Sequence, residues 1–163
     1  MRKILSLVSM LVLSGMLFQA CQQAPQESYE TEWLGETKQE IVNNLEEQFQ
    51  GFSRTMREVS YRYAELYWAG MDENWEYAEY QREHITEAME QGFVRRPERE
   101  ASAQQFTTAA LPEIEEIINS GDKERFLGSF TRLSASCNTC HAMEEVSFMT
   151  IIIPETRHSV VSF

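Results

Sequence analysis

Apolar residues recur at steps of three and four through residues 37–69 of this chain of 163 amino acids. This spacing places them on one narrow face of a helix. The members of the stripe are Ile41, Leu45, Phe49 (or Gln48 at strict heptad spacing), Phe52, Met56, Val59, Tyr63 and Leu66. Only seven Gly and four Pro are available for turns, which disfavours a turn-rich β fold. We therefore expect a first helix over residues 37–69, with Gly70 as its C-cap.

Two further helical segments follow this first one. We expect the second helix over residues 74–91, with Asp72 or Asn74 as its N-cap and Gly92 just beyond its end. The third helix should begin near Ser102, because Ser102 and Gln105 have the spacing of a capping box.

The third helix is expected to end near Ser120 and Gly121. Pro112 lies inside it, and proline lacks the N–H that the helix needs there. The sequence therefore predicts a kink, or two shorter pieces, in this segment.

Asp122 can cap a fourth helix, whose apolar stripe continues into cysteine residues. The inward positions of the second, third and fourth helices are Trp75, Ala78, Ile85 and Met89, then Phe106, Ala110, Ile114 and Ile117, then Phe126, Phe130, Leu133, Cys137 and Cys140. Short connections between the first and second helices, and between the third and fourth, predict antiparallel neighbours. The expected fold is an all-α antiparallel four-helix bundle with an extended C-terminal tail from about residue 148.

The N-terminus has the organisation of an export signal. Arg2 and Lys3 precede an uncharged run over residues 4–18, whose helical length of ~22 Å is short of a ~30 Å bilayer core. Such a segment is typical of a cleaved secretory signal, here residues 1–20. Cys21 follows directly, and a small residue before cysteine resembles the lipobox of bacterial lipoproteins. We expect Cys21 to be lipidated; ordinary cleavage that leaves a free thiol is the alternative.

Residues 21–36 are rich in Gln, Glu, Ser and Pro and show no periodicity, which predicts a flexible tether before a domain over residues 37–163. This organisation predicts an exported protein on the periplasmic or cell-envelope side. Its expected partner there is a membrane, which it contacts through the lipid on Cys21.

The residues from Cys137 to His141 form the Cys-x-x-Cys-His pattern of covalent haem attachment. On a helix, residues at i, i+3 and i+4 share one face. The thiols of Cys137 and Cys140 can then add to the two vinyl groups on one porphyrin edge. His141 would bind the iron as its proximal ligand. The sequence therefore predicts one covalent haem c.

Two other chemistries are open to the same motif. Cys137 and Cys140 could form a disulfide of the redox type, although that motif normally opens a helix in a βαβ setting. A zinc site would need a fourth ligand beyond the two cysteines and His141, and only His84 and His158 remain as imidazoles.

Four helices with the haem motif late in the fourth resemble the cytochrome c-prime superfamily, including its low-spin members with a methionine ligand. The resemblance extends over residues 37–145 and matches Cys137, Cys140 and His141 residue by residue. Residues 75–78 also resemble those of bacterial haem lipoproteins of this kind. The resemblance implies that a first-helix residue faces the iron, either as a thioether ligand or as a bulky blocker.

Residue counting favours Met56 as the residue opposite His141. Met56 and the two cysteines lie at similar depths from the helix connections, within ~6 Å at ~1.5 Å per residue. We expect Met56 as a possible distal iron ligand; a plain core methionine is the alternative. Met89 on the second helix is the runner-up, and Phe52 could instead block the iron. His84 lies too near the connections, whereas His158 in the tail could reach many places.

The formal net charge is −12, from 14 Lys+Arg against 26 Asp+Glu, and such a surface repels phosphate backbones. We therefore expect no nucleic-acid partner. The haem propionates would need cations, and the candidates are Arg54, Arg57, Arg95 and Arg96.

No nucleophile stands beside a base, and no carboxylate pair suggests catalysis, so we expect no enzyme. The leading hypothesis is a membrane-tethered electron carrier with an unidentified redox partner protein. The second is a haem protein that binds nitric oxide or carbon monoxide at an open sixth position. The third is a structural or zinc lipoprotein without haem.

Overall fold

The computed structural model describes residues 32–159 and residue 161, and all regular secondary structure in this part of the chain is helical. The predicted all-α class is confirmed for these residues, with helices that pack on one another. The predicted signal peptide, Cys21 and residues 21–31 of the predicted tether lie outside the described residues. Within the described part, no helix is both long and apolar enough to cross a membrane.

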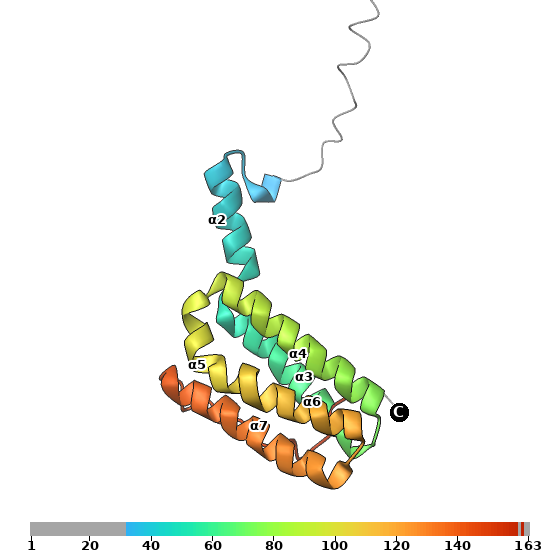
Figure 1. Ribbon diagram of the computed structural model, residues 1–163. Coiled ribbons are helices and arrows are strands. Elements are labelled where there is room, and N and C mark those ends of the chain that lie inside the picture. Colours follow the sequence, from blue (N-terminus) through green and yellow to red (C-terminus); the bar gives the residue numbers. More distant parts are fainter. Residues whose placement is uncertain (1–31, 160, 162–163) are drawn as a thin grey trace, which may run out of the picture. The chain divides into compact units, whose positions relative to one another are not determined.

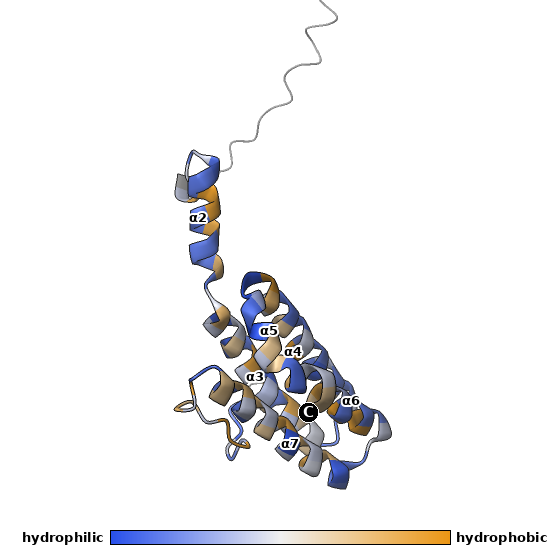
Figure 2. Ribbon diagram, turned by 60° about the vertical axis from the view of Figure 1, so that its left-hand side comes forward, coloured by the Kyte–Doolittle hydropathy of each residue, from blue (hydrophilic) through white to orange (hydrophobic). Residues whose placement is uncertain are grey.

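The chain divides into two compact units, residues 1–48 and residues 49–163, and each is described by itself. In the first unit, the 3₁₀ helix η1 (Glu32–Leu34) precedes α2 (Lys38–Phe49). The Asn44 side chain donates hydrogen bonds to the carbonyls of Trp33 and Leu34, both at 3.1 Å. Hydrophobic residues gather along one side of α2 (Figure 2), yet no residue of this helix is buried.

The predicted first helix over residues 37–69 is wrong as a single piece, because the chain breaks it at Gln50 and Gly51. Gln50 has a φ of 58°, a left-handed conformation that ends α2. Gly51 is the N-cap of the next helix, α3 (Phe52–Met71). The break lies just after the point where the apolar residue, Phe49, is one position later than heptad spacing requires. Phe49 is accordingly 59% exposed and not part of the core.

In the second unit, α3 packs beside α4 (Trp75–Arg95), as Figure 1 shows. The Asn74 side chain caps α4, as predicted, by accepting a hydrogen bond from the Tyr77 N–H at 3.2 Å. The predicted end of this helix before Gly92 is wrong, because α4 continues through Gly92 to its last residue at position 95. Gly92 is buried against α3, where a Cβ atom would meet the Thr55 side chain at 2.8 Å.

The third helical segment consists of three consecutive pieces. They are α5 (Glu100–Gln105), the π-helix η3 (Phe106–Ala110) and α6 (Leu111–Ser120). The predicted division of this segment at Pro112 is confirmed. Proline cannot donate to the helix ladder, and the Leu111 N–H just before it bonds to the Phe106 carbonyl, five residues back.

The prediction for the third segment is wrong at its start and correct at its end. The predicted start at Ser102 is wrong, because a 3₁₀ helix, η2 (Pro97–Arg99), leads into α5 two residues earlier. Ser102 lies inside α5, and its hydroxyl donates to the Arg99 carbonyl at 3.0 Å. Gly121 ends α6 with a φ of 65°, as predicted for a glycine C-cap.

The last helix, α7 (Lys123–Met143), begins after Asp122, whose carboxylate accepts a hydrogen bond from the Arg125 N–H at 3.0 Å, as predicted. α3 packs on α4 and α7, and α6 packs on the same two helices (Figure 1). The buried hydrophobic residues are Val59, Tyr63, Leu66, Ala69, Ala78, Ile85, Met89, Ala103, Phe106, Ala110, Leu111, Ile114, Ile117, Ile118, Phe126, Phe130 and Leu133. Every inward position predicted from Val59 onward is in this set, except Trp75, Cys137 and Cys140, which pack against it partly buried.

Gly70 has a packing role that differs from its predicted role as a C-cap. α3 ends at Met71 with Asp72 as its C-cap, so Gly70 lies inside the helix and is buried. A Cβ atom at Gly70 would lie 2.2 Å from ring atoms of Phe126. The glycine therefore permits the close approach of α7 to α3.

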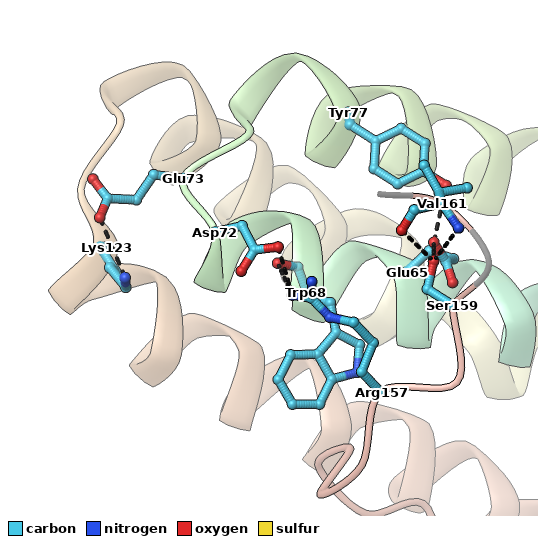
Figure 3. Close-up of polar contacts among 9 residues, drawn as sticks. All are labelled: Glu65, Trp68, Asp72, Glu73, Tyr77, Lys123, Arg157, Ser159 and Val161. Carbon is cyan, nitrogen blue, oxygen red and sulfur yellow. Dashed lines mark hydrogen bonds and ion pairs between the residues drawn. The ribbon is translucent and has the colours of Figure 1, made fainter. Parts of the chain in front are cut away.

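After α7, residues 146–159 form neither helix nor strand and are held against α3 by polar contacts (Figure 3). The Arg157 guanidinium bonds to the Asp72 carboxylate at 2.5 Å and lies 4.9 Å from the centre of the Trp68 ring. The Ser159 hydroxyl donates to the Glu65 carboxylate at 2.8 Å.

Glu65 is 3% exposed and also accepts a hydrogen bond from the Tyr77 hydroxyl at 3.0 Å (Figure 3). Burial raises the pKa of Tyr77, and the hydrogen bond to Glu65 raises it further. Tyr77 therefore remains a donor at physiological pH. Two hydroxyl groups thus satisfy this buried carboxylate, one of them from the C-terminal segment.

We predict opposite effects of alanine at two helical glycines. Gly70→Ala should lower the free energy of unfolding by ~1–3 kcal/mol, because the new methyl group overpacks against Phe126. Gly128→Ala is the matched control on α7, where a Cβ atom would meet only Arg132 Nη1, at 3.6 Å. It should raise the free energy of unfolding by ~0.5–1 kcal/mol through helix propensity. Urea denaturation of both variants measures the difference, and a stabilising Gly70→Ala would contradict the packing described.

Candidate functional site

A largely apolar cavity of about 310 Å³ lies between α3, α4, α5, η3 and α7 in the second unit. Residues from the helices before α7 that line it are Met56, Val59, Ser60, Tyr63, Ala64, Met89, Ala103 and Phe106. The remaining lining residues are Cys137, Cys140, His141, Thr150, Ile151, Ile152 and Pro154. Ligand pockets in proteins typically measure ~300–1,000 Å³. The cavity is therefore large enough to bind a ligand.

The motif residues all line this cavity. Cys137, Cys140 and His141 lie in the last two turns of α7, and their i, i+3 and i+4 spacing places them on one face. Both thiols are free and half-buried. The Cys140 thiol lies 3.7 Å from the Ser102 hydroxyl of α5 and donates toward it. The two sulfur atoms are thus available at the cavity wall.

Burial raises the pKa of the Cys137 thiol to about 12, with a smaller contribution from the neighbouring Cys140. A thiol with such a pKa is protonated at neutral pH. Redox-active Cys-x-x-Cys pairs depend on a lowered pKa instead. This electrostatic setting does not favour the alternative of a redox disulfide.

The His141 ring has a defined orientation. Its Nδ1 lies 2.6 Å from the Met149 carbonyl oxygen. A carbonyl can only accept a hydrogen bond, so Nδ1 carries the proton. The other nitrogen, Nε2, is then left with its lone pair. Histidines that bind metals commonly have this arrangement, with one ring nitrogen donating to a carbonyl.

Two methionines on α3 and α4 line the same cavity as the motif. Met56 is half-buried on α3, whereas Met89 on α4 is 3% exposed. Both sequence candidates for the distal position therefore face the space that the motif faces, and the geometry leaves the choice between them open.

The phenylalanine that lines the cavity is not the one predicted. Phe52 is absent from the lining residues and instead stacks on Phe93, with ring centres 5.9 Å apart. Phe106 lines the cavity from the π-helix η3 and is buried. The prediction of Phe52 as a blocker is therefore not supported, because its ring packs between α3 and the end of α4.

The two other histidines lie away from the cavity lining. His84 Nδ1 lies 2.9 Å from the Tyr80 carbonyl, and its ring is 4.1 Å from the Tyr80 ring centre. His158 is exposed in the C-terminal segment. Both positions agree with their low ranking from the sequence.

Of the predicted arginines, Arg95 reaches from α4 to a buried residue of α3. Its Nη2 donates to the hydroxyl of Thr55, the neighbour of Met56 in sequence, at 2.9 Å, and its buried Nε has no hydrogen-bond partner. Arg54 and Arg57 are exposed on α3, and Arg57 bonds to Gln50 at 2.6 Å. Arg95 thus has a buried donor that is not used within the described residues.

A zinc site at the motif lacks further ligands among the residues that the structure describes. There, no group of three or more His, Cys, Asp or Glu side chains is arranged to hold a metal ion. The zinc alternative therefore gains no support from these residues.

Sequence reasoning missed the contribution of the C-terminal segment to the site. Thr150, Ile151, Ile152 and Pro154 form one wall of the cavity. The Tyr63 hydroxyl donates to the Ile152 carbonyl at 3.0 Å and bonds to the Ser134 hydroxyl at 2.6 Å. Residues without helical spacing carry no periodic signal that could relate them to the motif.

Comparison with family models, with curated proteins and with solved structures finds no match to this chain.

We predict slow alkylation of Cys137 in the haem-free, folded chain. A pKa of about 12, against an ordinary value of 9.0, leaves very little thiolate at pH 8, and burial, the larger cause, persists when Cys140 is replaced. A Cys140→Ala variant should therefore react with iodoacetamide far more slowly when folded than in urea. The matched control carries alanine at both cysteines and Thr139→Cys, an exposed position on the same helix. Its alkylation rate should change little between the two conditions, and equally fast reaction of folded Cys137 would contradict its burial.

Proposed function

We propose that this chain is a c-type cytochrome that binds one covalent haem and carries electrons. The observation that carries the proposal is that Cys137, Cys140 and His141 line a single apolar cavity whose other walls contain Met56 and Met89. Haem would supply an iron that alternates between the ferric and ferrous states.

The residues present fit such a group. Cys137 and Cys140 offer two thiols at adjacent turns of α7 for thioether bonds, and His141 offers an Nε2 lone pair because its Nδ1 proton is engaged by the Met149 carbonyl. The methionine side chains offer thioether sulfur on another wall, a ligand type that raises haem potential. The largely apolar lining lowers the local dielectric constant, which strengthens the influence of these few polar groups.

The finer architecture belongs to the same proposal. We propose an antiparallel four-helix bundle of the cytochrome c-prime type, formed by α3, α4, the segment from α5 to α6, and α7. The residues after α7 would be its extended tail. The protein would be exported and anchored to a membrane through a lipid on Cys21, and it would exchange electrons with another protein.

Covalent haem is the first outcome to test. The exported protein should retain one haem per chain after acid–acetone extraction, because thioether bonds survive this treatment. Intact mass and the pyridine haemochrome spectrum measure it. Cys137→Ser with Cys140→Ser should abolish the retained haem, whereas His141→Ala should keep the haem attached and change only the iron spectrum. Complete extraction from the wild-type protein would overturn the proposal.

The distal position can be assigned by comparing two methionine variants. Met56→Ala should shift the iron toward high spin, speed carbon monoxide binding to the ferrous form and lower the midpoint potential, because a thioether ligand is lost. Met89→Ala should mainly cost ~2–5 kcal/mol of stability, as for other buried methionines. Absorption spectra, stopped-flow binding and redox titration measure these effects.

The reverse pattern would assign the ligand to Met89 on α4. A wild-type protein that is already high-spin and binds carbon monoxide readily would instead favour a gas-binding function over electron transfer. In that case Met56 only covers the open position.

A further inference from the structure

The C-terminal segment meets α7 next to His141 through paired hydrogen bonds. The Asn138 side chain donates from Nδ2 to the Ile151 carbonyl at 2.9 Å and accepts at Oδ1 from the Ile151 N–H at 2.7 Å. Among ordinary side chains, only the amides of Asn and Gln can both donate and accept in this way. Asn138 therefore binds the backbone of residue 151 as a neighbouring strand would.

Ile151, which pairs with Asn138, comes two residues after Met149, whose carbonyl orients His141. The Met149 carbonyl accepts the His141 Nδ1 proton, with the two atoms 2.6 Å apart. On its other side, residue 149 is held only by a turn, in which its N–H bonds to the Val146 carbonyl at 2.9 Å. Asn138 thus fixes the chain just after the Met149 carbonyl.

Apolar packing holds this stretch only in part, through Ile151, which packs against the core. Phe148 is 82% exposed and Met149 is 48% exposed. Ile151 is half-buried and lines the cavity, and the carbonyl of Ile152 accepts from the Tyr63 hydroxyl at 3.0 Å. Hydrogen bonds to α7 and α3, with Asn138 contributing two, therefore add to the packing of Ile151 in holding residues 149–152.

We propose that Asn138, a variable position within the haem-attachment pattern, is a positioning residue for His141. Through Ile151 it holds the Met149 carbonyl on Nδ1, which fixes the tautomer of His141 and aims Nε2 into the cavity. The proposal rests on the proposed function only for the identity of the group that His141 meets there. The hydrogen bonds of Asn138 and His141 are present whether or not the proposed function is correct.

The consequence for a bound iron has a definite sign. A hydrogen bond from Nδ1 to a carbonyl raises the basicity of the ligating nitrogen. A more basic ligand stabilises the ferric state, so the wild-type contact should lower the midpoint potential. Loss of the Met149 contact should raise it.

The test compares Asn138→Ala with Thr139→Ala in the full chain. Thr139 is the other variable residue of the motif, is exposed and bonds only within α7, to the Ala135 carbonyl at 3.0 Å, so it is a matched control. In the haem-containing protein, Asn138→Ala should raise the midpoint potential and accelerate hydrogen exchange at the Ile151 N–H, while Thr139→Ala should do neither. Faster exchange with an unchanged potential would reduce Asn138 to a purely structural residue and overturn the proposal.

A second arm separates failure of this proposal from failure of the proposed function. If the purified wild-type chain carries no haem, ¹⁵N NMR of its His141 ring reports the tautomer directly. The wild-type ring should carry its proton on Nδ1, and Asn138→Ala should shift the population toward Nε2–H. An unchanged tautomer would overturn the role of Asn138. Should Asn138→Ala not fold, Asn138→Asp keeps the bond from the Ile151 N–H and should give an intermediate shift of the tautomer.

Discussion

One face of α7 fills the core in its first turns and lines the cavity in its last turns. The packing of the second unit depends on this change in side-chain size along the helix. In its first turns the face carries Phe126, Phe130 and Leu133, which are fully buried in the core. In its last turns the same face carries Cys137 and Cys140, which are much smaller. Ser60, Ala64 and Ala103 across from them are also small, so this layer of side chains does not fill its space. The cavity is therefore a consequence of side-chain volume within a continuous helical stripe.

Helical spacing predicted the core of the second unit well, because amphipathic helices bury one face regardless of connection details. The residues that misled the prediction are those whose role is tertiary. Gly70 and Gly92 are typical helix ends by local rules, yet both are buried inside helices where a neighbouring side chain leaves no room for a Cβ atom. The break at Gln50 was equally hidden, because glutamine seldom adopts a positive φ and only the slip in the stripe marked the site.

Within the candidate site, helical spacing predicted the residues on regular helices. It missed the residues of the C-terminal segment, which have no helical spacing relative to the motif. Counting residues from the helix connections placed Met56 and Met89 at the level of the cysteines, and both line the cavity. Phe106 was predicted as an inward position and is buried, but helical spacing alone did not indicate that it lines the cavity. The wall formed by residues 150–154 depends on individual hydrogen bonds to Asn138 and Tyr63, which composition does not reveal.

These hydrogen bonds give the C-terminal segment two separate attachments. Near the motif it is held by Asn138, Tyr63 and His141, and farther along α3 it is held by Asp72, through Arg157, and by the buried Glu65, through Ser159. Fraying from the C-terminal side must break the contacts of Ser159 and Arg157 before it reaches the cavity wall. Opening the wall requires breaking polar contacts that are partly buried, and each buried partner left without a hydrogen bond costs ~1–3 kcal/mol. The same contacts that close the cavity therefore also keep the His141 ring in its orientation.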